Sequence, residues 1–346
     1  MTRNKWTLKA VLMIMLLTIF IGGCSKSSQI NNDANSSEKN NKSQYPIKIK
    51  NKFGTTVIKQ KPKRVATIQW GNQDIPLALG VEPVGFSAAN FGVKDKSGLL
   101  PWTKKKLKQL DVKDPNVFRD TDGLDFEAIA DSKPDVILAA YSGITKEDYK
   151  TLSKIAPVVA YPKSPWTTSW KEQVRLDAKG MGMEKQGKRL ISKTEQKIQN
   201  GVKHYPQLKG KTVTWVNFSA RDLSKFQIYT SADPRPALLE EFGLKYPQSI
   251  TREIKSKESY SKDFSSEKAE VLNDTDIIVG YGDQKLYKAL KNDPILGKVP
   301  AIKRGSVAFI NSDSPIVAAG TPTPLSIDYT LDEYLDLLGK AAGKVQ

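Results

Sequence analysis

The side chains that could do chemistry in this chain of 346 residues are mainly aromatic residues and arginines. One Cys (Cys24) and one His (His204) exclude a disulfide framework, a zinc site of several Cys and any catalysis needing two imidazoles. A hydrolase would need a nucleophile beside a base; Ser87 follows a predicted strand, but His204 is far along the chain. No glycine-rich phosphate loop follows any predicted strand. The sequence therefore predicts a binding protein that is not an enzyme and uses no cofactor.

Aromatic residues stand at the ends of four predicted strands: Trp70, Tyr141, Phe218 and Tyr281. In open parallel sheets, ligands bind in the crevice beyond the carboxyl ends of the strands, so these side chains are predicted to share one cleft. Trp102 and Trp166 fall in adjacent loops. Aromatic rings offer a large contact area at a small cost in rotamer entropy, which suits a bulky amphipathic ligand. The alternative for each residue is a place in the hydrophobic core.

Three arginines fall in loops that are predicted to border the same cleft: Arg119, Arg221 and Arg235. A planar guanidinium binds a carboxylate through two hydrogen bonds, which a lysine cannot reproduce. The alternative is a structural salt bridge, for which Asp222 and Asp233 are close in sequence. Arg119 and Arg221 are the stronger candidates. Together with the aromatics they favour an anionic ligand, and a neutral ligand held mainly by the aromatics is the alternative.

Short apolar strands and amphipathic helices alternate twice along the chain. The first half has predicted strands at 64–68, 81–86, 135–141 and 157–160, with helices at 74–79, 126–130 and 146–155. The second half has strands at 211–216 and 276–281, with helices at 236–242 and 266–272. Such alternation predicts parallel sheets with right-handed crossovers, and hence two α/β lobes, 45–165 and 205–346.

The segment between the lobes, 166–204, has apolar residues at helical spacing and no β-branched cluster. It is predicted to form a long interlobe helix with one bend or break near Gly180 and Gly182, because glycine weakens a helix interior. A helix of this kind is stiffer than a pair of connecting strands. Little hinge motion between the lobes is therefore expected.

The N-terminus reads as a targeting segment. Basic residues precede an uncharged stretch, 10–23, which is too short to span a bilayer and is typical of a signal peptide covering 1–23. Cys24 follows two glycines, as in the bacterial lipobox, where the Cys is lipidated and becomes the mature N-terminus. Residues 24–44 are polar and form a predicted disordered tether. The expected location is the outer face of the cell membrane of a Gram-positive bacterium.

The net charge of +17 has a simple interpretation as a lysine-rich, solvated surface. Nucleic-acid binding would favour basic residues interleaved with aromatics on one element, and an exported anchor makes such a partner unexpected. A basic surface suits an anionic cell envelope or the attraction of anionic ligands. No nucleic-acid partner is predicted.

Two sequence stretches carry a resemblance to a known family: 74–85, which runs from Asp74 through a Gly-Val-Glu-Pro-Val-Gly ending, and 126–138, which ends in Lys-Pro-Asp and an aliphatic strand. Residues 155–159 also match. Over about 45–340, the chain resembles substrate-binding lipoproteins of iron-siderophore ABC importers, in the class III, helical-backbone periplasmic binding protein family. The resemblance implies two Rossmann-like lobes with central parallel sheets and a monomer that captures a ferric siderophore between them.

The resemblance also implies delivery of the ligand to a transmembrane permease, with an acidic residue on each lobe docking onto permease arginines. The matching positions are Glu127 in the first lobe and Glu240, the nearest candidate, in the second. The siderophore's own oxygens wrap the iron, so the protein needs no metal ligands. The alternative is a member of the same family that binds haem or cobalamin. A His that ligates haem would have to lie in the cleft, where the strands end, whereas His204 precedes a predicted strand. A non-transport envelope lipoprotein is the third possibility.

Overall fold

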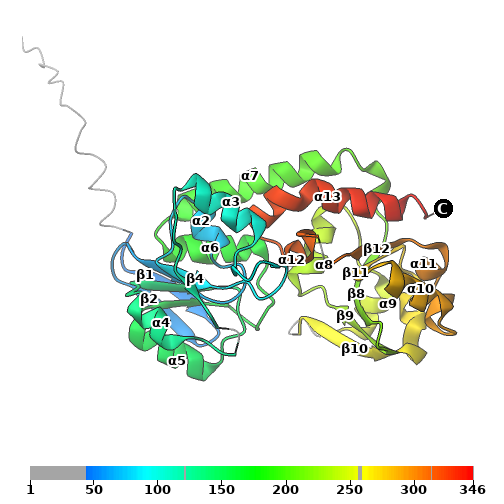
Figure 1. The fold of residues 1–346 in the computed structure, drawn as a ribbon, viewed down its shortest axis with the longest axis horizontal. Helices are drawn as coiled ribbons and strands as arrows, with labels where there is room; N and C mark the ends of the chain where they lie inside the picture. The colour runs from blue at the N-terminus through cyan, green and yellow to red at the C-terminus, as the bar shows by residue number, and fades with distance from the viewer. Residues whose placement is uncertain (1–43, 121, 256–258, 313, 346) are drawn as a thin grey trace, which may run out of the picture. The chain divides into compact units, whose positions relative to one another are not determined.

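The computed structural model describes residues 44–120, 122–255, 259–312 and 314–345. The predicted signal peptide, Cys24 and all of the tether before residue 44 lie outside the described residues. Residues 44 onward form one compact unit that contains both predicted lobes (Figure 1). Within the described residues, no helix is long and apolar enough to cross a membrane.

The first lobe is built on a five-stranded parallel sheet in the order β5-β4-β3-β6-β7. Its strands are β3 (Val65–Thr67), β4 (Gly85–Ser87), β5 (Val117–Phe118), β6 (Val136–Ala139) and β7 (Val158–Ala160), and its helices are α2 (Asp74–Ala78), α3 (Pro101–Gln109), α4 (Phe126–Asp131) and α5 (Lys146–Ile155). A hairpin, β1 (Ile47–Asn51) with β2 (Gly54–Ile58), precedes the sheet. The predicted helices and strands of this half are present, except that the strand expected over 81–86 is confined to β4; the hairpin, α3 and β5 were not predicted. The apolar runs of β6 and β7 are buried on both faces, as in other parallel sheets.

The second lobe has a five-stranded sheet in the order β10-β9-β8-β11-β12. The strands are β8 (Val213–Ser219), β9 (Asp222–Tyr229), β10 (Ser261–Ser265), β11 (Ile277–Tyr281) and β12 (Val307–Ile310). β8, β11 and β12 are parallel, whereas β9 and β10 are antiparallel and were not predicted. Around the sheet lie α8 (Pro234–Glu241), α9 (Gln248–Glu253), α10 (Gln284–Asn292), α11 (Pro300–Arg304) and α12 (Ile316–Ala319); 266–272 is a 3₁₀ helix.

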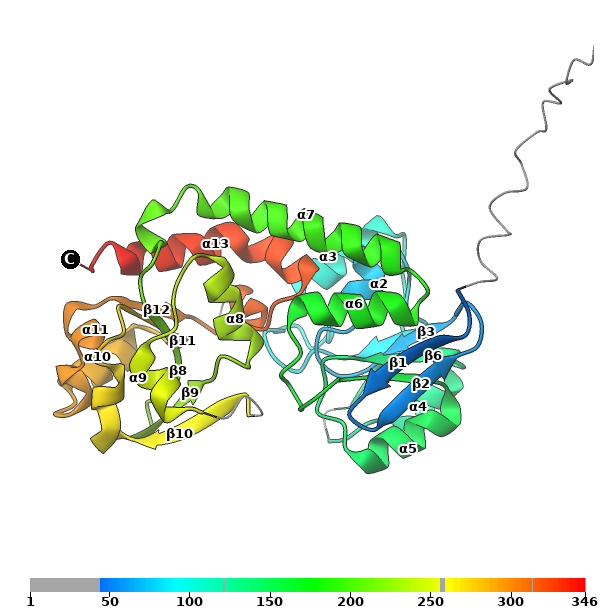
Figure 2. The same ribbon diagram turned by 180° about the vertical axis from the view of Figure 1, so that it is seen from behind.

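Three helices join the lobes. α6 (Trp170–Gly180) and α7 (Glu184–Val202) occupy the predicted interlobe segment, and the predicted break lies at 181–183, where Gly182 has a φ of 68°. α13 (Pro324–Ala342), near the end of the chain, runs beside α7 (Figure 2). Each of the latter two has 19 residues, or about 28 Å of helix.

One apolar core runs through both lobes and this helical layer. It includes Val65 and Val136 from the first sheet, Val213 and Ile277 from the second, and Leu335 from α13. Because interiors of this kind are densely packed, movement of one lobe against the other would disturb a shared core. This arrangement supports the expectation of little hinge motion.

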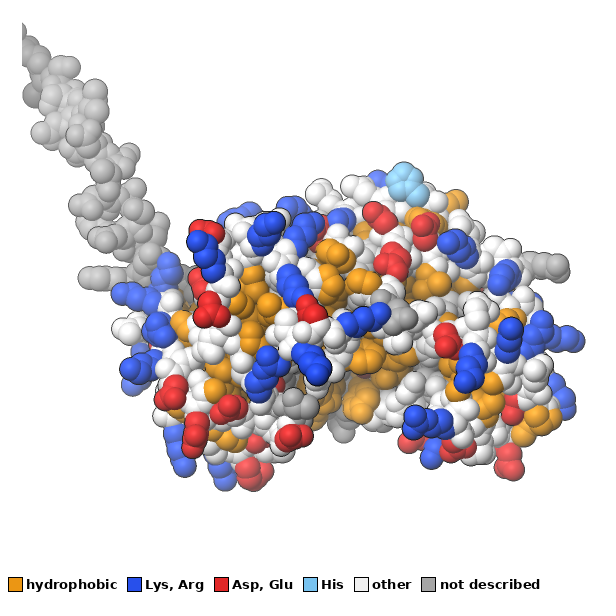
Figure 3. Space-filling view, in the orientation of Figure 1, with side chains coloured by type: hydrophobic (Ala, Val, Ile, Leu, Met, Phe, Trp, Pro, Cys, Tyr) orange, Lys and Arg blue, Asp and Glu red, His pale blue; other side chains and the backbone are white. Residues whose placement is uncertain are grey.

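Charged side chains are distributed over the face of the molecule that Figure 3 shows. Lysine and arginine side chains are spread over the visible face and interspersed with acidic ones (Figure 3). This distribution agrees with the interpretation of the positive charge as a solvated surface.

Candidate functional site

A cavity of about 580 Å³ lies between the two sheets. The first lobe contributes Gln69, Trp70, Ser87, Ala88, Asn90, Phe91, Asp120, Gly123, Leu124, Tyr141 and Trp166, and the rest of the chain contributes Tyr229, Arg235, Tyr260, Tyr281, Val317, Ala318 and Thr321. Its volume is in the range that holds a small-molecule ligand. Several lining residues directly follow strands β3, β4 and β6 or end strand β11. The carboxyl ends of the parallel strands therefore point to this cavity, as predicted.

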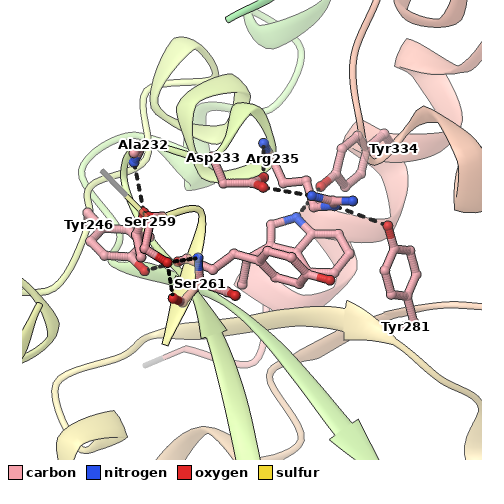
Figure 4. Close-up of polar contacts among 11 residues, drawn as sticks. Ala232, Asp233, Arg235, Tyr246, Ser259, Ser261, Tyr281 and Tyr334 are labelled. Carbon is pink, nitrogen blue, oxygen red and sulfur yellow. Dashed lines mark hydrogen bonds and ion pairs between the residues drawn. The ribbon is translucent and has the colours of Figure 1, made fainter. Parts of the chain in front are cut away.

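Arg235 is the cationic centre of the second-lobe wall (Figure 4). Its Nη1 donates to Asp233 Oδ2 at 2.7 Å and its Nε donates to Tyr281 Oη at 3.2 Å. The guanidinium also lies over the ring of Tyr229, 4.4 Å from the centroid. Asp233 is fully buried and caps α8, accepting the backbone N–H of Arg235 at 2.8 Å. Both charged residues therefore belong to the N-terminus of α8, Asp233 as its cap and Arg235 in its first turn.

The pKa values follow from this burial. Burial raises the pKa of Asp233, and the adjacent Arg235 opposes that rise. Burial would lower the pKa of Arg235, but Asp233 and the neighbouring tyrosines together outweigh it and hold the arginine pKa well above its usual value. Burial also raises the pKa of Tyr229 to about 12. Arg235 and Asp233 form an ion pair at 2.7 Å, and Tyr229 is a neutral phenol at neutral pH.

Aromatic rings form the other walls. Phe91 contacts rings from both sheets, with its centroid 6.5 Å from that of Trp70 and 5.6 Å from that of Tyr281. Its side chain is 43% exposed although it is large and apolar. Trp166 packs edge-on against Tyr141 at 5.3 Å. The cavity thus presents ring faces and edges to whatever it holds.

The backbone at two lining residues is strained. Gln69 and Trp166 have φ values of 60° and 61°, in the left-handed region that side chains other than glycine rarely adopt. Gln69 Oε1 accepts the N–H of Gly143 at 2.7 Å, and Trp166 N–H donates to Ser142 O at 3.1 Å. A Cβ on Gly143 would lie 2.5 Å from the indole nitrogen of Trp166, so glycine is needed there. Strain of this kind concentrates at functional sites.

A polar chain occupies the first-lobe side of the cavity. Ser87 Oγ accepts the backbone N–H of Gln69 at 2.7 Å and donates to Asp120 Oδ2. Burial raises the pKa of Asp120, and the Ser87 hydrogen bond lowers it by less. Ser87 therefore orients a carboxyl group and has no His near it, since His204 is not among the cavity-lining residues.

The structure brings five of the predicted ligand-binding residues to this cavity: Trp70, Tyr141, Trp166, Arg235 and Tyr281. Their contacts with a ligand stay predictions. In the described parts of the chain, no group of three His, Cys, Asp or Glu residues is placed to hold a metal ion.

The expected placement of two second-lobe residues is wrong. Phe218 is 5% exposed and packs against Phe226 in a separate core cluster, because β8 continues past its parallel section into the hairpin with β9. Arg221 lies in the exposed turn of that hairpin. Neither residue lines the cavity.

Two first-lobe residues also lie elsewhere than expected. Trp102 is 3% exposed in α3 and donates its indole N–H to Asp74 Oδ2 at 2.8 Å, so it is a core residue. Arg119 is exposed and its Nη1 donates to Lys96 O at 3.1 Å. The next residue, Asp120, lines the cavity instead.

Four cavity residues were not predicted from the sequence: Phe91, Asp120, Tyr229 and Tyr260. Tyr229 ends β9, a strand whose Asp, Ser and Lys residues hide its pattern. Asp120 follows the two-residue strand β5, which is too short to recognise by periodicity. For Tyr229, the usable signal was its match to the other strand-end aromatics.

Comparison with known proteins agrees with this geometry. A family model described as periplasmic binding protein matches residues 65–314. PiaA of Streptococcus pneumoniae TIGR4, in a crystal structure with ferrichrome, is 52% identical, with a TM-score of 0.84 over 87% of this chain and 100% of that one.

Two further relatives are more distant. The iron-uptake system-binding protein of Bacillus subtilis is 26% identical over 92% of this chain and 94% of its own. SirA of Staphylococcus aureus, crystallised with staphyloferrin B, is 26% identical with a TM-score of 0.63 over 84% and 98%. The family match covers well over half of the sequence and includes both five-stranded sheets and most of the residues that line the cavity. The chain therefore belongs to the periplasmic binding protein family.

Proposed function

We propose that this protein captures a ferric siderophore in the cavity between its lobes and delivers it to the permease of an ABC importer. The observation that carries the proposal is an aromatic-walled cavity with a fixed arginine, in a chain 52% identical to a protein crystallised with ferrichrome. The siderophore already coordinates its iron. The protein then needs only to recognise the outer shape and charge of the complex, without metal ligands or catalysis.

The charge of the cavity favours a ferric hydroxamate. Two lining residues in the described parts of the chain have side chains that are ordinarily charged, Arg235 and Asp120. Arg235 is already matched by the buried Asp233. Since Arg119 and Arg221 lie elsewhere, the sequence-based preference for an anionic complex loses its main support. A neutral tris-hydroxamate complex, like ferrichrome, suits this balance better.

A haem-binding role has less support. None of the lining residues in the described parts of the chain is His, Met or Cys. Tyrosine is the remaining type of axial ligand, and Tyr281 Oη already accepts a hydrogen bond from Arg235. Burial raises the pKa values of Tyr141 and Tyr229, which disfavours the tyrosinate form that binds iron.

Anchoring outside the cell follows from the sequence and forms part of the proposal. A signal peptide over 1–23 and lipidation at Cys24 would hold a monomer on the outer face of the membrane, with the polar tether allowing it to reach the permease. A lipoprotein Cys carries more than one acyl chain, and a single chain alone binds only marginally.

Tryptophan fluorescence tests the function directly. Because Trp70 and Trp166 line the cavity, titration with ferrichrome is expected to quench the emission and saturate at one equivalent. Iron-free ferrichrome, haem and cobalamin serve as comparisons. Saturable binding of haem or cobalamin without any response to ferric hydroxamates, catecholates or carboxylates would contradict the proposal.

Docking to the permease is proposed for two exposed carboxylates, Glu127 in the first turn of α4 and Glu240 near the end of α8. Glu127→Ala is expected to lower uptake of radiolabelled ferric siderophore by cells several-fold while the affinity of the purified protein stays unchanged. Glu184→Ala is the matched control, because Glu184 is an exposed first-turn glutamate of α7, a helix that lies across the molecule from α4 (Figure 1). Normal uptake by Glu127→Ala cells would remove this residue from the docking role.

A further inference from the structure

Asp120 presents a carboxylate to the cavity from a fixed position. It follows β5, and its Oδ2 accepts the hydroxyl hydrogen of Ser87. Ser87 is itself held by the backbone N–H of Gln69, a lining residue with a φ of 60°. The carboxyl group therefore has little freedom to turn away from the cavity.

Among the residues that the structure describes, none gives this carboxylate a cationic partner. Within the described residues, no lysine or arginine forms an ion pair with Asp120, and its neighbour Arg119 donates to Lys96 O outside the cavity. Burial is the main cause of the raised pKa of Asp120, and the nearby charge of Asp125 adds to it. The opposite wall offers no compensation, since the guanidinium of Arg235 is bound by Asp233 at 2.7 Å.

The described residues therefore set two carboxylates, Asp120 in the cavity lining and the fully buried Asp233 beside Arg235, against the one guanidinium of Arg235. We propose that Asp120 sets the charge specificity of the site: it rejects ferric siderophores with anionic peripheral groups and pairs with a cationic substituent, such as a protonated amine, on a ferric hydroxamate. This inference rests on the proposed function and narrows its substrate class. Burying a like charge beside Asp120 is unfavourable, whereas an ammonium group would supply the cationic partner that none of the described residues provides.

A matched series of ligands tests this inference. Ferric desferrioxamine B carries a free ammonium group, its N-acetyl derivative is neutral, and its N-succinyl derivative is anionic, while all three have the same tris-hydroxamate iron centre. Dissociation constants are measured by fluorescence quenching for the wild type, Asp120→Asn and Asp122→Asn, with ferrichrome as a reference. Asp122 is an exposed aspartate two residues away that does not line the cavity, so its replacement controls for a general change of charge.

For the wild type, affinity is expected to fall from the amine to the acetyl to the succinyl complex. Asp120→Asn is expected to reduce the amine-to-succinyl affinity ratio by about tenfold to a hundredfold, the range for hydrogen bonds between charged groups. Asp122→Asn should keep the wild-type ratio. Equal ratios in the wild type and Asp120→Asn, or ferrichrome binding without binding of any member of the series, would overturn the inference. Failure to bind ferrichrome and the whole series would instead count against the proposed function.

Discussion

Arg235→Ala is expected to abolish high-affinity binding and to lower the free energy of unfolding by about 3–5 kcal/mol, the usual cost of removing one partner of a buried ion pair. The arginine side chain is 16% exposed and Asp233 is fully buried, so the variant would leave a carboxylate without a partner inside the protein. The same change removes the cation from above the Tyr229 ring and the donor from Tyr281 Oη. Tyr229 and Tyr281, which line the cavity, then lose the contacts that fix their positions.

The two effects can be separated. Adding Asp233→Asn to Arg235→Ala is expected to recover much of the stability, because the unpaired charge is gone, while leaving ferrichrome binding impaired. Arg221→Ala is the matched control, since Arg221 is exposed in a hairpin turn outside the cavity, and it should change neither quantity. Urea denaturation measures the free energy of unfolding, and fluorescence titration measures the affinity for ferrichrome. Wild-type affinity in Arg235→Ala would remove this residue from the binding site.

Asp74 is expected to make the protein less stable as the pH rises from about 4 to 6. Its carboxyl group is fully buried between α2, α3 and the start of α13. It accepts hydrogen bonds from Trp102 at 2.8 Å, Thr103 at 3.3 Å and Thr323 at 2.5 Å. Burial raises its pKa from 3.8 to about 6, and these hydrogen bonds only partly oppose the rise.

A carboxyl whose pKa is higher in the folded state holds its proton longer there than in the unfolded chain. Between the two pKa values the folded state binds more protons, so the free energy of unfolding falls as the pH rises and becomes constant above the folded pKa. The pKa change corresponds to about 3 kcal/mol. Since the carboxyl joins helices of the first lobe to α13, this loss weakens the shared helical layer.

Comparison with Asp74→Asn isolates this group, because an amide does not titrate and all other groups contribute equally. The difference in unfolding free energy, variant minus wild type, should rise by about 2.5 kcal/mol between pH 4 and pH 7. Trp102→Phe removes one hydrogen-bond donor that lowers the pKa of Asp74, so the loss of stability should extend to higher pH than in the wild type. Parallel stability curves for the wild type and Asp74→Asn would show that this carboxyl has an ordinary pKa.

The strand-end residues show which parts of the site the sequence could predict. Trp70, Tyr141 and Tyr281 could be placed because the carboxyl ends of parallel strands meet at one edge of a sheet. The same rule was wrong for Phe218, since β8 leaves its parallel partner at Trp215 and pairs with β9 from Val216 onward. The polar residues of β9 gave no strand pattern, which also hid Tyr229 at its end.

The arginines show what sequence position alone could not decide. Arg119 and Asp120 are neighbours in an extended segment, where successive side chains point to opposite sides, so one is in solvent and the other lines the cavity. An error of one residue in the predicted position of this segment therefore places Arg119 in the cavity and Asp120 in solvent. The sequence could name Arg235 as a candidate but could not rank it above the other two arginines. Its ion pair with Asp233 and its position over the Tyr229 ring depend on how α8 packs against β9.

The most direct test of the central claim is to locate the iron. Crystals of the protein grown with ferrichrome are expected to give an anomalous iron signal within the cavity lined by Trp70, Trp166 and Arg235, with the ligand's own oxygens as the iron's first coordination shell. Iron bound by protein side chains, or bound ferrichrome at a surface away from this cavity, would contradict the claim.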